Sequence, residues 1–548
     1  MAKHNKLQRL IFKLSSKELR RGGWNLNIKL ADAEMDGLLT PIAESTVIRW
    51  IDELNHAGNV DGKIRECLAG IRALRRQEST NDTRTEMRRL YREKLNLSLV
   101  EDYVNVVMDS NKDYKELCAH GFMLNGIKFV RLLSTTNGVK MKTVVFCSER
   151  LHPIIRFRLD NGRNLEKPIV PAKFGAYEAL ACSSSTPLSW PDGILVVPDC
   201  YTDFVEDVIT LDDNENGEPI MREERGYKIH KDASDGFGTM TPERAAKWSA
   251  ELGIEAPVSG MNMRCAFLKG MLVPFDHVAF AEAFNGASPE NEGGYMVRDI
   301  WGTRRDVRDC DVVFTESMLK LWSSYKSLED YLDNCRMNHY EISTTKQAPL
   351  AHVPMWTTNY QFLQSYELSD EDINELVQPT IDNIRDVLGG DYRKMLLYLC
   401  GRNITPNTFY NCDNGYIKAL MVDGAEVNDP YVRQSVSRLI RKRINQAKMG
   451  KLDVHGHFEI ACGDPFSLWQ SIFGLPVTGI LKAGEMYSEF WQDSDEVLLF
   501  RSPMSVHNNI RKMRVCHSDE ARYWYRGIKT MVVLNSWDTA TDAMNGQD

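Results

Sequence analysis

The sequence predicts a multidomain α+β protein. Its 548 residues are enough for about three or four domain-sized units. Apolar residues recur with a helical period in residues 1–120 and again in 326–450. Short β-branched and apolar runs, bounded by Gly, Asn, Asp and Pro, occur between these regions and again after residue 451. Helices and strands therefore belong to different stretches of the chain.

The first region, residues 1–120, is predicted to be helical. Residues 45–54 have apolar side chains at helical spacing, and residues 83–97 are highly charged, as in an exposed helix. No residue of this region indicates a chemical activity.

Residues 121–235 are predicted to be rich in strands. Runs at 127–133, 142–147 and 193–197 have the length and composition of β-strands. The acidic stretch from Asp212 to Glu218 contains Asn and Gly but lacks the ligand spacing of a calcium-binding loop. We expect this stretch to be the exposed tip of a hairpin.

Residues 326–450 are predicted to form a helical connector, which ends in the most basic segment of the chain, residues 433–448. Leu439, Ile440 and Ile444 would give this helix one apolar stripe. Its cations are compatible with a solvated face or with a surface that follows phosphates, and the sequence does not separate the two interpretations.

The composition narrows the class of protein. No apolar run approaches the ~18 residues of a membrane helix, and the N-terminus carries Lys and Arg instead of a secretory signal. The 12 cysteines include no Cys-x-x-Cys pair, so we expect reduced thiols and a cytoplasmic protein. The net charge of −9 argues against a protein that coats nucleic acid, although a local basic groove is compatible with it.

Two segments in the middle of the chain combine turns with cations. Asp235–Gly238 is a glycine-rich turn ahead of a helix start at Thr241, an arrangement that can present N–H groups to an anion. Lys269 and Gly270 lie between two apolar strands, where a lysine either points to solvent or pairs with a carboxylate or a phosphate. From these residues alone, an ordinary turn and an exposed lysine are the simpler interpretations.

Two further cations follow predicted strands. Lys320 is expected in the first turns of an amphipathic helix after the strand that ends near Thr315. Arg501 follows the apolar strand 496–500 and precedes Pro503, whose fixed backbone would hold the guanidinium on a stiff segment. A guanidinium held in this way suits recognition of a ribose or a phosphate.

The last residues, 545–548, have the sequence Asn-Gly-Gln-Asp and come after an apolar strand at 531–534. A turn that presents a carboxylate rigidly suits Mg²⁺. Either this ending is due to chance, or the sequence stops where a metal-binding loop begins, at Asp548. Asp538 and Asp542 fit an exposed or capped turn better than a metal site.

The order of these segments resembles that in the cell-encoded RNA-dependent RNA polymerases of RNA silencing and in related single-chain phage RNA polymerases. Most of the chain after about residue 120 is covered by the resemblance. It rests on motifs similar to the family's Asp-Gly-x-Gly, Arg…Lys-Gly and Arg-x-Ser-Met-x-Lys patterns. In the third pattern, Thr315 stands in place of the arginine. Weaker matches occur elsewhere in the chain. The matching segments are 129–133, 171–187, 235–238, 264–270, 314–320, 463–466 and 501–504.

The resemblance implies a fold with two double-psi β-barrels. Residues 236–325 would form a complete first barrel, 326–450 the helical connector, and 451–548 the start of a truncated second, catalytic barrel. His507 lies one residue later than the family's histidine, so no role is transferred to it.

The resemblance also implies roles for single residues. Arg264, Lys269 and Arg501 would bind the nucleotide, with Lys269 and Lys320 facing its phosphates and the primer end. Asp548 would be the first of three Mg²⁺-binding aspartates, the others coming from downstream residues or from a second chain. Two metal ions and these cations would stabilise the charge that develops in nucleotidyl transfer.

The function implied is template-directed RNA synthesis from nucleoside triphosphates, with Mg²⁺ as cofactor. A single-stranded DNA or RNA template and the nascent RNA would be the partners, in the host cytoplasm for a phage protein, and this chain alone would be inactive. A non-catalytic nucleic-acid-binding or assembly protein that kept the barrels is an alternative, and a structural protein with accidental matches is a third. An in-frame x-Asp-Gly-Asp after codon 548 would favour the polymerase over the binding protein.

Overall fold

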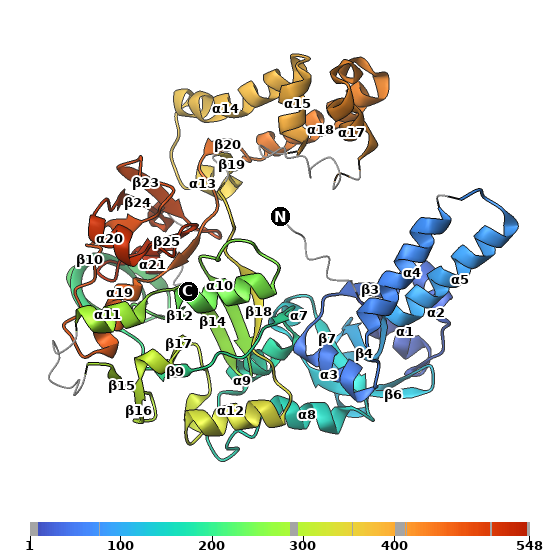
Figure 1. The fold of residues 1–548 in the computed structure, drawn as a ribbon, viewed down its shortest axis with the longest axis horizontal. Helices are drawn as coiled ribbons and strands as arrows, with labels where there is room; N and C mark the ends of the chain where they lie inside the picture. The colour runs from blue at the N-terminus through green and yellow to red at the C-terminus, as the bar shows by residue number, and fades with distance from the viewer. Residues whose placement is uncertain are drawn as a thin grey trace. The chain divides into compact units, whose positions relative to one another are not determined.

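The computed structural model describes residues 9–75, 77–284, 294–352, 355–400, 412, 414–504 and 507–544. Two compact units are present, and Figure 1 shows their helices and strands. Unit 1 contains Met1–Ala348, Cys462–Ile480 and Glu520–Ile528, and unit 2 contains Pro349–Ala461, Leu481–Asp519 and Lys529–Asp548. The units interleave along the sequence, and the five consecutive regions expected above stay predictions.

Unit 1 begins with a seven-stranded sheet in the order β2-β5-β6-β7-β4-β1-β3, in which β1–β4 and β2–β5 are parallel. The strands are β1 (Arg9–Ser15), β2 (Asn25–Leu26), β3 (Leu39–Ile42), β4 (Leu99–Val107), β5 (Phe122–Leu124), β6 (Ile127–Leu133) and β7 (Thr143–Ser148). The accompanying helices are α1 (Ser16–Arg21), α2 (Leu30–Met35), α3 (Thr46–Leu54), α4 (Val60–Leu74), α5 (Asn81–Ser98), α6 (Asn111–His120), α7 (Thr136–Lys140), α8 (His152–Asp160), α9 (Pro171–Glu178) and η1 (Ala179–Cys182).

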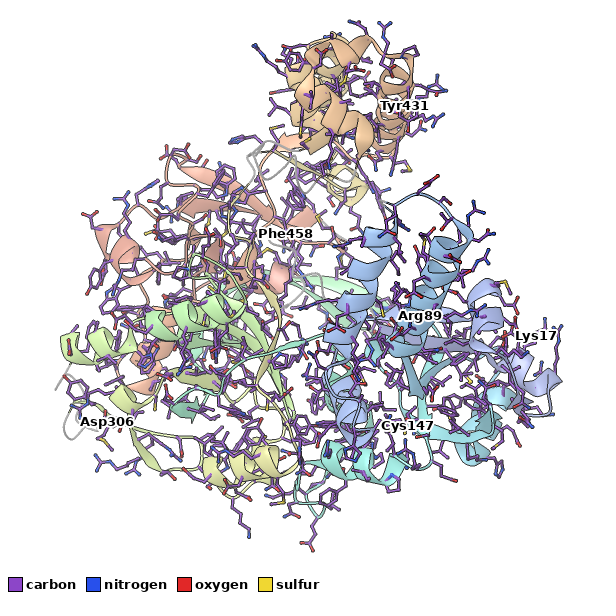
Figure 2. All side chains as sticks on the ribbon, turned by 45° about the vertical axis from the view of Figure 1, so that its right-hand side comes forward. Lys17, Arg89, Cys147, Asp306, Tyr431 and Phe458 are labelled. Carbon is purple, nitrogen blue, oxygen red and sulfur yellow. The ribbon has the colours of Figure 1, made fainter. Side chains whose placement is uncertain are left out.

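The N-terminal region contains strands that the sequence analysis does not predict. Helices α3 and α5 confirm the predictions at 45–54 and 83–97. Arg89, which is labelled in Figure 2, lies on α5. It pairs with Glu86 and Glu93 at 2.7 and 2.8 Å. Strand β4 follows α5 directly, with no residue between Ser98 and Leu99. No Gly or Pro separates the two elements, so the sequence carries no boundary signal there.

A second seven-stranded sheet lies in the part of the chain where the first barrel is expected. Its order is β8-β18-β13-β14-β12-β17-β9, with β12–β14 and β17–β9 parallel. The range 186–347 is wider than the predicted 236–325, because β8, β9 and β18 add to it. The strands are β8 (Thr186–Pro187), β9 (Ile194–Val197), β12 (Phe237–Met240), β13 (Met261–Cys265), β14 (Leu268–Pro274), β17 (Val312–Thr315) and β18 (Ser343–Gln347).

One buried cluster connects this sheet to the N-terminal helices. It includes Trp50 of α3, Met263 of β13 and Trp248 on a helix that covers the sheet. Along β13 the inward residues are fully or almost fully buried, while Arg264 on the other face is half-buried. The remaining elements between residues 201 and 337 are β10 (Tyr201–Asp213), β11 (Pro219–Asp232), β15 (Met296–Arg298), β16 (Arg304–Asp306), α10 (Pro242–Glu251), α11 (His277–Ala283), η2 (Val307–Asp309), η3 (Trp322–Ser324) and α12 (Leu328–Met337).

The acidic stretch at residues 212–218 is a hairpin tip, as predicted. Strands β10 and β11 pair along their lengths, and the Asn214 N–H donates to the Glu218 carbonyl at 2.8 Å. The side chains at the tip are largely exposed.

Two helices from the last part of the chain complete unit 1. They are α19 (Pro465–Ile472) and α20 (Asp519–Trp524), and Trp469 and Trp524 pack against Phe280 of α11. Asp464, at the N-terminus of α19, is 1% exposed and accepts hydrogen bonds from the Tyr525 hydroxyl (2.6 Å) and the Ser467 hydroxyl (2.9 Å). Residues 463–466, one of the segments that resemble the family's motifs, thus anchor the start of α19 through Asp464.

Unit 2 consists of a helical arm and a five-stranded sheet in the order β21-β25-β22-β24-β23. The arm begins and ends with the paired strands β19 (Met355–Thr357) and β20 (Asp453–His455). Its helices are α13 (Tyr360–Gln364), α14 (Asp370–Leu388), α15 (Tyr392–Cys400), α17 (Gly415–Val422), η4 (Gly424–Asn428) and α18 (Pro430–Lys448). The sheet region contains β21 (Ile460–Cys462), β22 (Glu485–Tyr487), β23 (Glu496–Phe500), η5 (His507–Asn509), β24 (Ile510–Val515), β25 (Met531–Leu534) and α21 (Ala540–Ala543).

Two sheets of mixed direction thus occupy the parts of the chain where barrels are expected, with helices before, between and after them. The α+β class and the helical connector are confirmed. Within the described ranges, no helix is both long and apolar enough to pass through a lipid bilayer.

The basic helix α18 buries a different stripe from the one predicted. Val432, Val436 and Ile440 are buried, whereas Ile444 is exposed. Arg443 takes the inward position one turn after Ile440, where its guanidinium pairs with Asp453 at 2.7 Å. Ile444 was predicted to lie in the apolar stripe, and this was wrong. The buried ion pair of Arg443 with Asp453 takes the inward position instead, which the hydrophobicity of the sequence does not reveal.

Candidate functional site

Two of the predicted cations face each other across one hairpin of unit 1. Strands β13 and β14 pair so that Arg264 is the direct cross-strand partner of Lys269. Cross-strand partners project to the same face of a sheet, and like charges placed in this way repel each other. An anion bound between or above the two side chains would relieve this repulsion.

The Arg264 guanidinium is half-buried and has no carboxylate within 4 Å among the described residues. Its Nη1 donates to the Met263 carbonyl at 2.6 Å, whereas its Nε is buried without a hydrogen-bond partner. Burial lowers the pKa of Arg264 from its ordinary value, because the charged form is partly desolvated. A buried cation with open donor capacity is suited to bind a phosphate or a carboxylate.

Glycines allow three segments to pack closely behind this hairpin. A Cβ at Gly270 would lie 2.5 Å from Met318 Cγ and 2.6 Å from the Gly236 carbonyl oxygen. A Cβ at Gly238 would lie 2.1 Å from the Val313 carbonyl oxygen. The glycines of the predicted Asp-Gly-x-Gly and Lys-Gly motifs are therefore required for backbone approach, because any side chain would collide with main-chain atoms or with Met318.

Lys320 lies beside the same hairpin, but not on the predicted helix. Residues after β17 form turns, and an isolated antiparallel bridge joins Leu319 to Leu268. The Lys320 N–H donates to the Phe267 carbonyl and the Lys269 N–H to the Met318 carbonyl, both at 3.0 Å. The amphipathic helix predicted here was wrong, because these residues use their backbone groups to pair with the tip of the hairpin. The bridge brings the two predicted lysines, distant in sequence, to one junction.

Asp199 holds the loops behind this junction. Its carboxylate is 6% exposed and accepts hydrogen bonds from Ser317 Oγ (2.7 Å), the Ser317 N–H (3.0 Å) and Ser234 Oγ (3.2 Å). Ser317 Oγ also accepts the Gly236 N–H at 2.9 Å. The turn at Asp235–Gly238 and the 314–320 segment are therefore fixed to each other through one buried carboxylate.

Burial raises the pKa of Asp199. The hydrogen bonds from Ser317 and Ser234 favour the charged form and lower the pKa, but their effect is smaller than that of burial. Burial also raises the pKa of Asp232 to about 7, and the neighbouring Asp199 carboxylate adds to the shift. Two acidic groups therefore lie close to each other near the cationic hairpin in a partly desolvated environment.

Asp199 and Ser234 were not among the predicted site residues, and no role was predicted for Ser317. Asp199 follows strand β9 and Ser234 follows strand β11, so the position of each after a strand was visible. Their convergence depends on the pairing of β9 with β17, which no local pattern indicates.

The other predicted site residues belong to unit 2. Arg501 follows β23, is exposed, and its Nη1 donates to the Met544 carbonyl at 3.4 Å. Asp548 lies outside the described residues, as do Asn545, Gly546 and Gln547. That Arg501 and Asp548 act together with Arg264, Lys269 and Lys320 stays a prediction.

Asp538 is half-buried in the bend between β25 and α21. It accepts hydrogen bonds from the Gly484 N–H and Asn535 Nδ2, both at 2.7 Å, and from the Ala540 N–H at 2.9 Å. Asp542 is exposed on α21.

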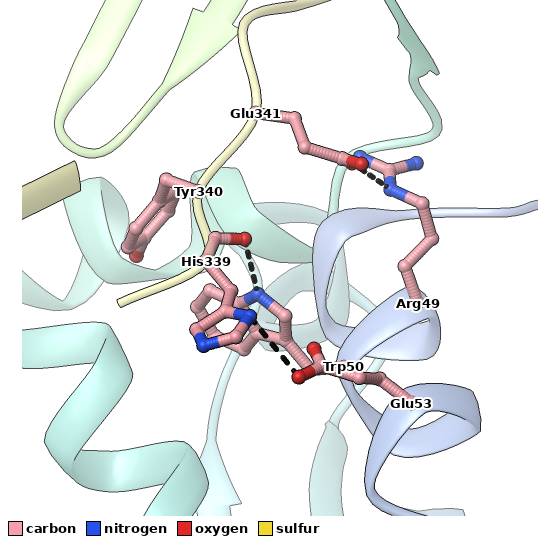
Figure 3. A pocket seen from close by; sticks show the side chains of 6 residues that line it. All are labelled: Arg49, Trp50, Glu53, His339, Tyr340 and Glu341. Atoms are coloured by element: carbon pink, nitrogen blue, oxygen red, sulfur yellow. Dashed lines mark hydrogen bonds and ion pairs between the residues drawn. The ribbon is translucent and has the colours of Figure 1, made fainter. Parts of the chain in front are cut away.

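A shallow pocket of about 330 Å³ lies elsewhere in unit 1 (Figure 3). Its charged groups bind one another: Arg49 pairs with Glu341 at 2.5 Å and His339 Nδ1 lies 3.0 Å from Glu53. The indole of Trp50 donates to the His339 carbonyl at 2.9 Å. Because these groups pair with one another, we interpret the pocket as a structural junction between α3 and residues 339–341.

Comparison with known proteins identifies the family. A family model described as RNA dependent RNA polymerase matches residues 72–546. The chain is 24% identical over 422 residues to the DNA-directed RNA polymerase YonO of Bacillus phage SPbeta, covering 74% of this chain and 46% of that protein. The solved structure of the RNA dependent RNA polymerase QDE-1 from Thielavia terrestris aligns with a TM-score of 0.47 at 14% identity, over 82% of this chain and 48% of that one.

The chain therefore spans about half the length of the relatives it matches. The family match includes the β13–β14 hairpin, the 314–320 segment and Arg501. On this match, the chain belongs to the RNA dependent RNA polymerase family.

Proposed function

We propose that this chain binds nucleoside triphosphates at the β13–β14 hairpin and takes part in template-directed RNA synthesis. The observation that carries the proposal is the direct pairing of Arg264 with Lys269, at a hairpin that lies within the family match. A triphosphate carries the negative charge that two neighbouring cations attract, and the buried Nε of Arg264 has no hydrogen-bond partner among the described residues.

The proposed roles follow from the chemistry of phosphoryl groups. Arg264 and Lys269 would hold the phosphates of the incoming nucleotide, and Lys320 would lie beside them because its segment is bridged to the hairpin. Arg501, by its likeness to the family motif, would contact the ribose or the primer end. Charge developing on the transferred phosphoryl group and on the leaving pyrophosphate is stabilised best by cations that are already in position.

Asp548 is the one residue of this chain that we propose as a ligand of Mg²⁺. Mg²⁺ prefers oxygen ligands in octahedral geometry, and when bound it would stabilise the attacking and leaving oxygens. Within the described ranges, the one group of three potential metal ligands is His352, His457 and Glu459, whose imidazoles do not suit Mg²⁺. Support for Asp548 as a ligand is therefore the motif resemblance.

For the template, we propose a single-stranded nucleic acid without choosing between DNA and RNA. The phage relative is named as DNA-directed and the matching family as RNA dependent, so single-stranded DNA and RNA are both candidate templates. Exposed cations on α18, Arg433, Arg438, Arg441, Lys442 and Lys448, have no carboxylate within 4 Å among the described residues and offer a surface for a phosphate backbone. A phage-type enzyme would work in the cytoplasm of its host.

The test begins with binding, which does not require a complete metal site. A fluorescent nucleoside triphosphate and labelled single-stranded RNA and DNA are titrated with the 548-residue chain. Binding of the triphosphate in competition with unlabelled nucleotide is the expected result. Binding of nucleic acid without any binding of nucleotide would instead support the alternative, a non-catalytic nucleic-acid-binding protein.

The second stage measures synthesis. Template-dependent incorporation of ribonucleotides with Mg²⁺ is followed for the unaltered chain and for Asp548→Ala, on RNA and on DNA templates. We expect incorporation to require Asp548, whether this chain acts alone or together with a second chain. Retained incorporation by Asp548→Ala would contradict its role as a metal ligand.

A further inference from the structure

Unit 2 contains a cluster of three potential metal ligands that the polymerase proposal does not use. His352, His457 and Glu459 place one ligand atom each within 4.8 Å of the others. Their side chains are 5%, 2% and 7% exposed, respectively. Phe458, labelled in Figure 2, lies between His457 and Glu459 in the sequence.

The distances within the cluster are close to those of a metal site. Nε2 of His352 lies 3.4 Å from Oε1 of Glu459, and Nε2 of His457 lies 2.7 Å from the same oxygen. Ligands around a tetrahedral Zn²⁺ ion, at about 2.0–2.1 Å from the metal, are about 3.3 Å apart. The first distance fits directly, and the second would have to open by about half an ångström.

An ion pair alone does not account for the cluster. His457 and Glu459 form a short contact that satisfies both, but Nε2 of His352 and Nδ1 of His457 are buried and have no hydrogen-bond partner in the described part of the chain. The two imidazoles also stack on each other, with ring centroids 4.0 Å apart. A buried imidazole nitrogen that points at a carboxylate without a hydrogen bond is costly unless a further group binds it.

The surroundings of the cluster support a fixed site. Ser488, which is fully buried, donates from Oγ to Oε1 of Glu459 at 3.0 Å and orients the carboxylate. Phe490 packs edge-on against both imidazoles, and Trp491 stacks on His457 with centroids 5.2 Å apart. Aromatic rings around the ligands limit the access of water and fix the ring orientations.

The cluster lies where the helical arm begins and ends. His352 precedes β19, at the start of the helical arm, whereas His457 and Glu459 follow β20, at its end. Strands β19 and β20 are short, with three residue pairs, and are the paired strands at the base of the arm. A metal ion held from both sides would close this base and restrict the arm more than three strand pairs can.

We propose that His352, His457 and Glu459 bind one divalent transition-metal ion of the Zn²⁺ class and clip together the two ends of the helical arm. Two imidazoles and one carboxylate suit Zn²⁺ and exclude Mg²⁺ as the preferred ion. The site is independent of the proposed polymerase activity, because it uses none of the residues assigned to the nucleotide.

The test uses the full chain after treatment with a chelator. Zn²⁺ is titrated by calorimetry in the presence of excess Mg²⁺, and the bound metal is counted by elemental analysis after gel filtration. The unaltered chain and His455→Ala, a control at an exposed histidine of β20, are expected to bind one Zn²⁺ per chain. His352→Ala and His457→Ala should bind at least about 100-fold more weakly, since even the loss of a residue that hydrogen-bonds to a metal ligand weakens metal sites about 10–100-fold.

Glu459→Gln keeps the shape of the side chain and one acceptor oxygen while removing the charge, so it tests the site in a chain that still folds. It should lose tight Zn²⁺ binding with an unchanged circular dichroism spectrum. Added Zn²⁺ should also slow amide hydrogen exchange in β19 and β20 of the unaltered chain but not in those of Glu459→Gln. Equal Zn²⁺ binding by the unaltered chain and Glu459→Gln, or no stoichiometric binding by either, would overturn the proposal.

Discussion

Arg264 and Lys269 are direct partners across the β13–β14 hairpin, so two cations stand on one face of the sheet. On the opposite face of β13, the side chains of Met261 and Met263 are completely buried. The hairpin is thus anchored by its apolar face and presents its charged face for binding. This division explains how a lysine can lie between apolar strands without being buried.

Removing either cation should weaken nucleotide binding with little effect on folding. Lys269 is exposed, so Lys269→Ala is expected to leave the free energy of unfolding within about 0.5 kcal/mol of the original. Hydrogen bonds to charged groups contribute about 1.5–3 kcal/mol, so affinity for a nucleoside triphosphate should fall about 10-fold or more. Fluorescence titration measures the change for Lys269→Ala and Arg264→Ala.

The matched control for this series is Lys247→Ala, which removes an exposed lysine from α10 in the same unit. Its affinity for the nucleotide should equal that of the original chain. An equal loss of affinity in the control would show that overall charge, and not the hairpin, determines binding.

The hydrogen bonds between Asp199 and Ser317 should contribute to stability. Ser317→Ala removes the 2.7 Å bond to a buried carboxylate and leaves the Gly236 N–H without its acceptor. We expect a loss of about 1–3 kcal/mol in the free energy of unfolding. Denaturant titration measures it, with Ser323→Ala, an exposed serine of η3, as the variant that should change nothing.

Two glycine substitutions should change stability in opposite directions. Gly238→Ala would place a Cβ 2.1 Å from the Val313 carbonyl oxygen, so the backbone must shift, at a cost of about 1–3 kcal/mol or more. Gly175→Ala meets no atom within 4 Å on helix α9 and should stabilise the protein by about 0.5–1 kcal/mol. Thermal unfolding of the two variants under identical conditions provides the comparison. A neutral Gly238→Ala would mean that the three segments do not pack as closely as described.

The raised pKa of Asp232 predicts a particular pH dependence. Burial holds this pKa at about 7 in the folded protein, against an ordinary value of 3.8. Between about pH 4 and pH 7 the folded state therefore retains a proton that the unfolded state has lost. The contribution of Asp232 to stability is complete below pH 4 and is lost as the pH rises through 7, with a slope of at most about 1.4 kcal/mol per pH unit.

Asp232→Asn should remove this contribution to the slope. The free energy of unfolding is measured at several pH values from 4 to 8 for the original chain, for Asp232→Asn and for Glu255→Gln, which changes an exposed carboxylate. The control should follow the original curve, while Asp232→Asn should be flatter between pH 4 and 7. Parallel curves for all three proteins would contradict the raised pKa.

The sequence alone was sufficient for the features that depend on local order. The glycine and lysine motifs, the hairpin tip at 212–218 and the helices α3 and α5 all follow from neighbouring residues, whose conformational preferences act over a few positions. The same local order allowed the family to be inferred, since the motifs occur in sequence along the chain.

The tertiary structure decided everything that depends on distant segments meeting. The pairing of Leu319 with Leu268, which replaces the expected helix at Lys320, and the inward turn of Arg443 toward Asp453 both arise from partners that no local pattern names. The joining of Ser234 and Ser317 by Asp199, and of His352 to His457 across the whole helical arm, is of the same kind. Hydrogen bonds and ion pairs are satisfied by whichever group the fold brings near, and only the folded chain specifies that group.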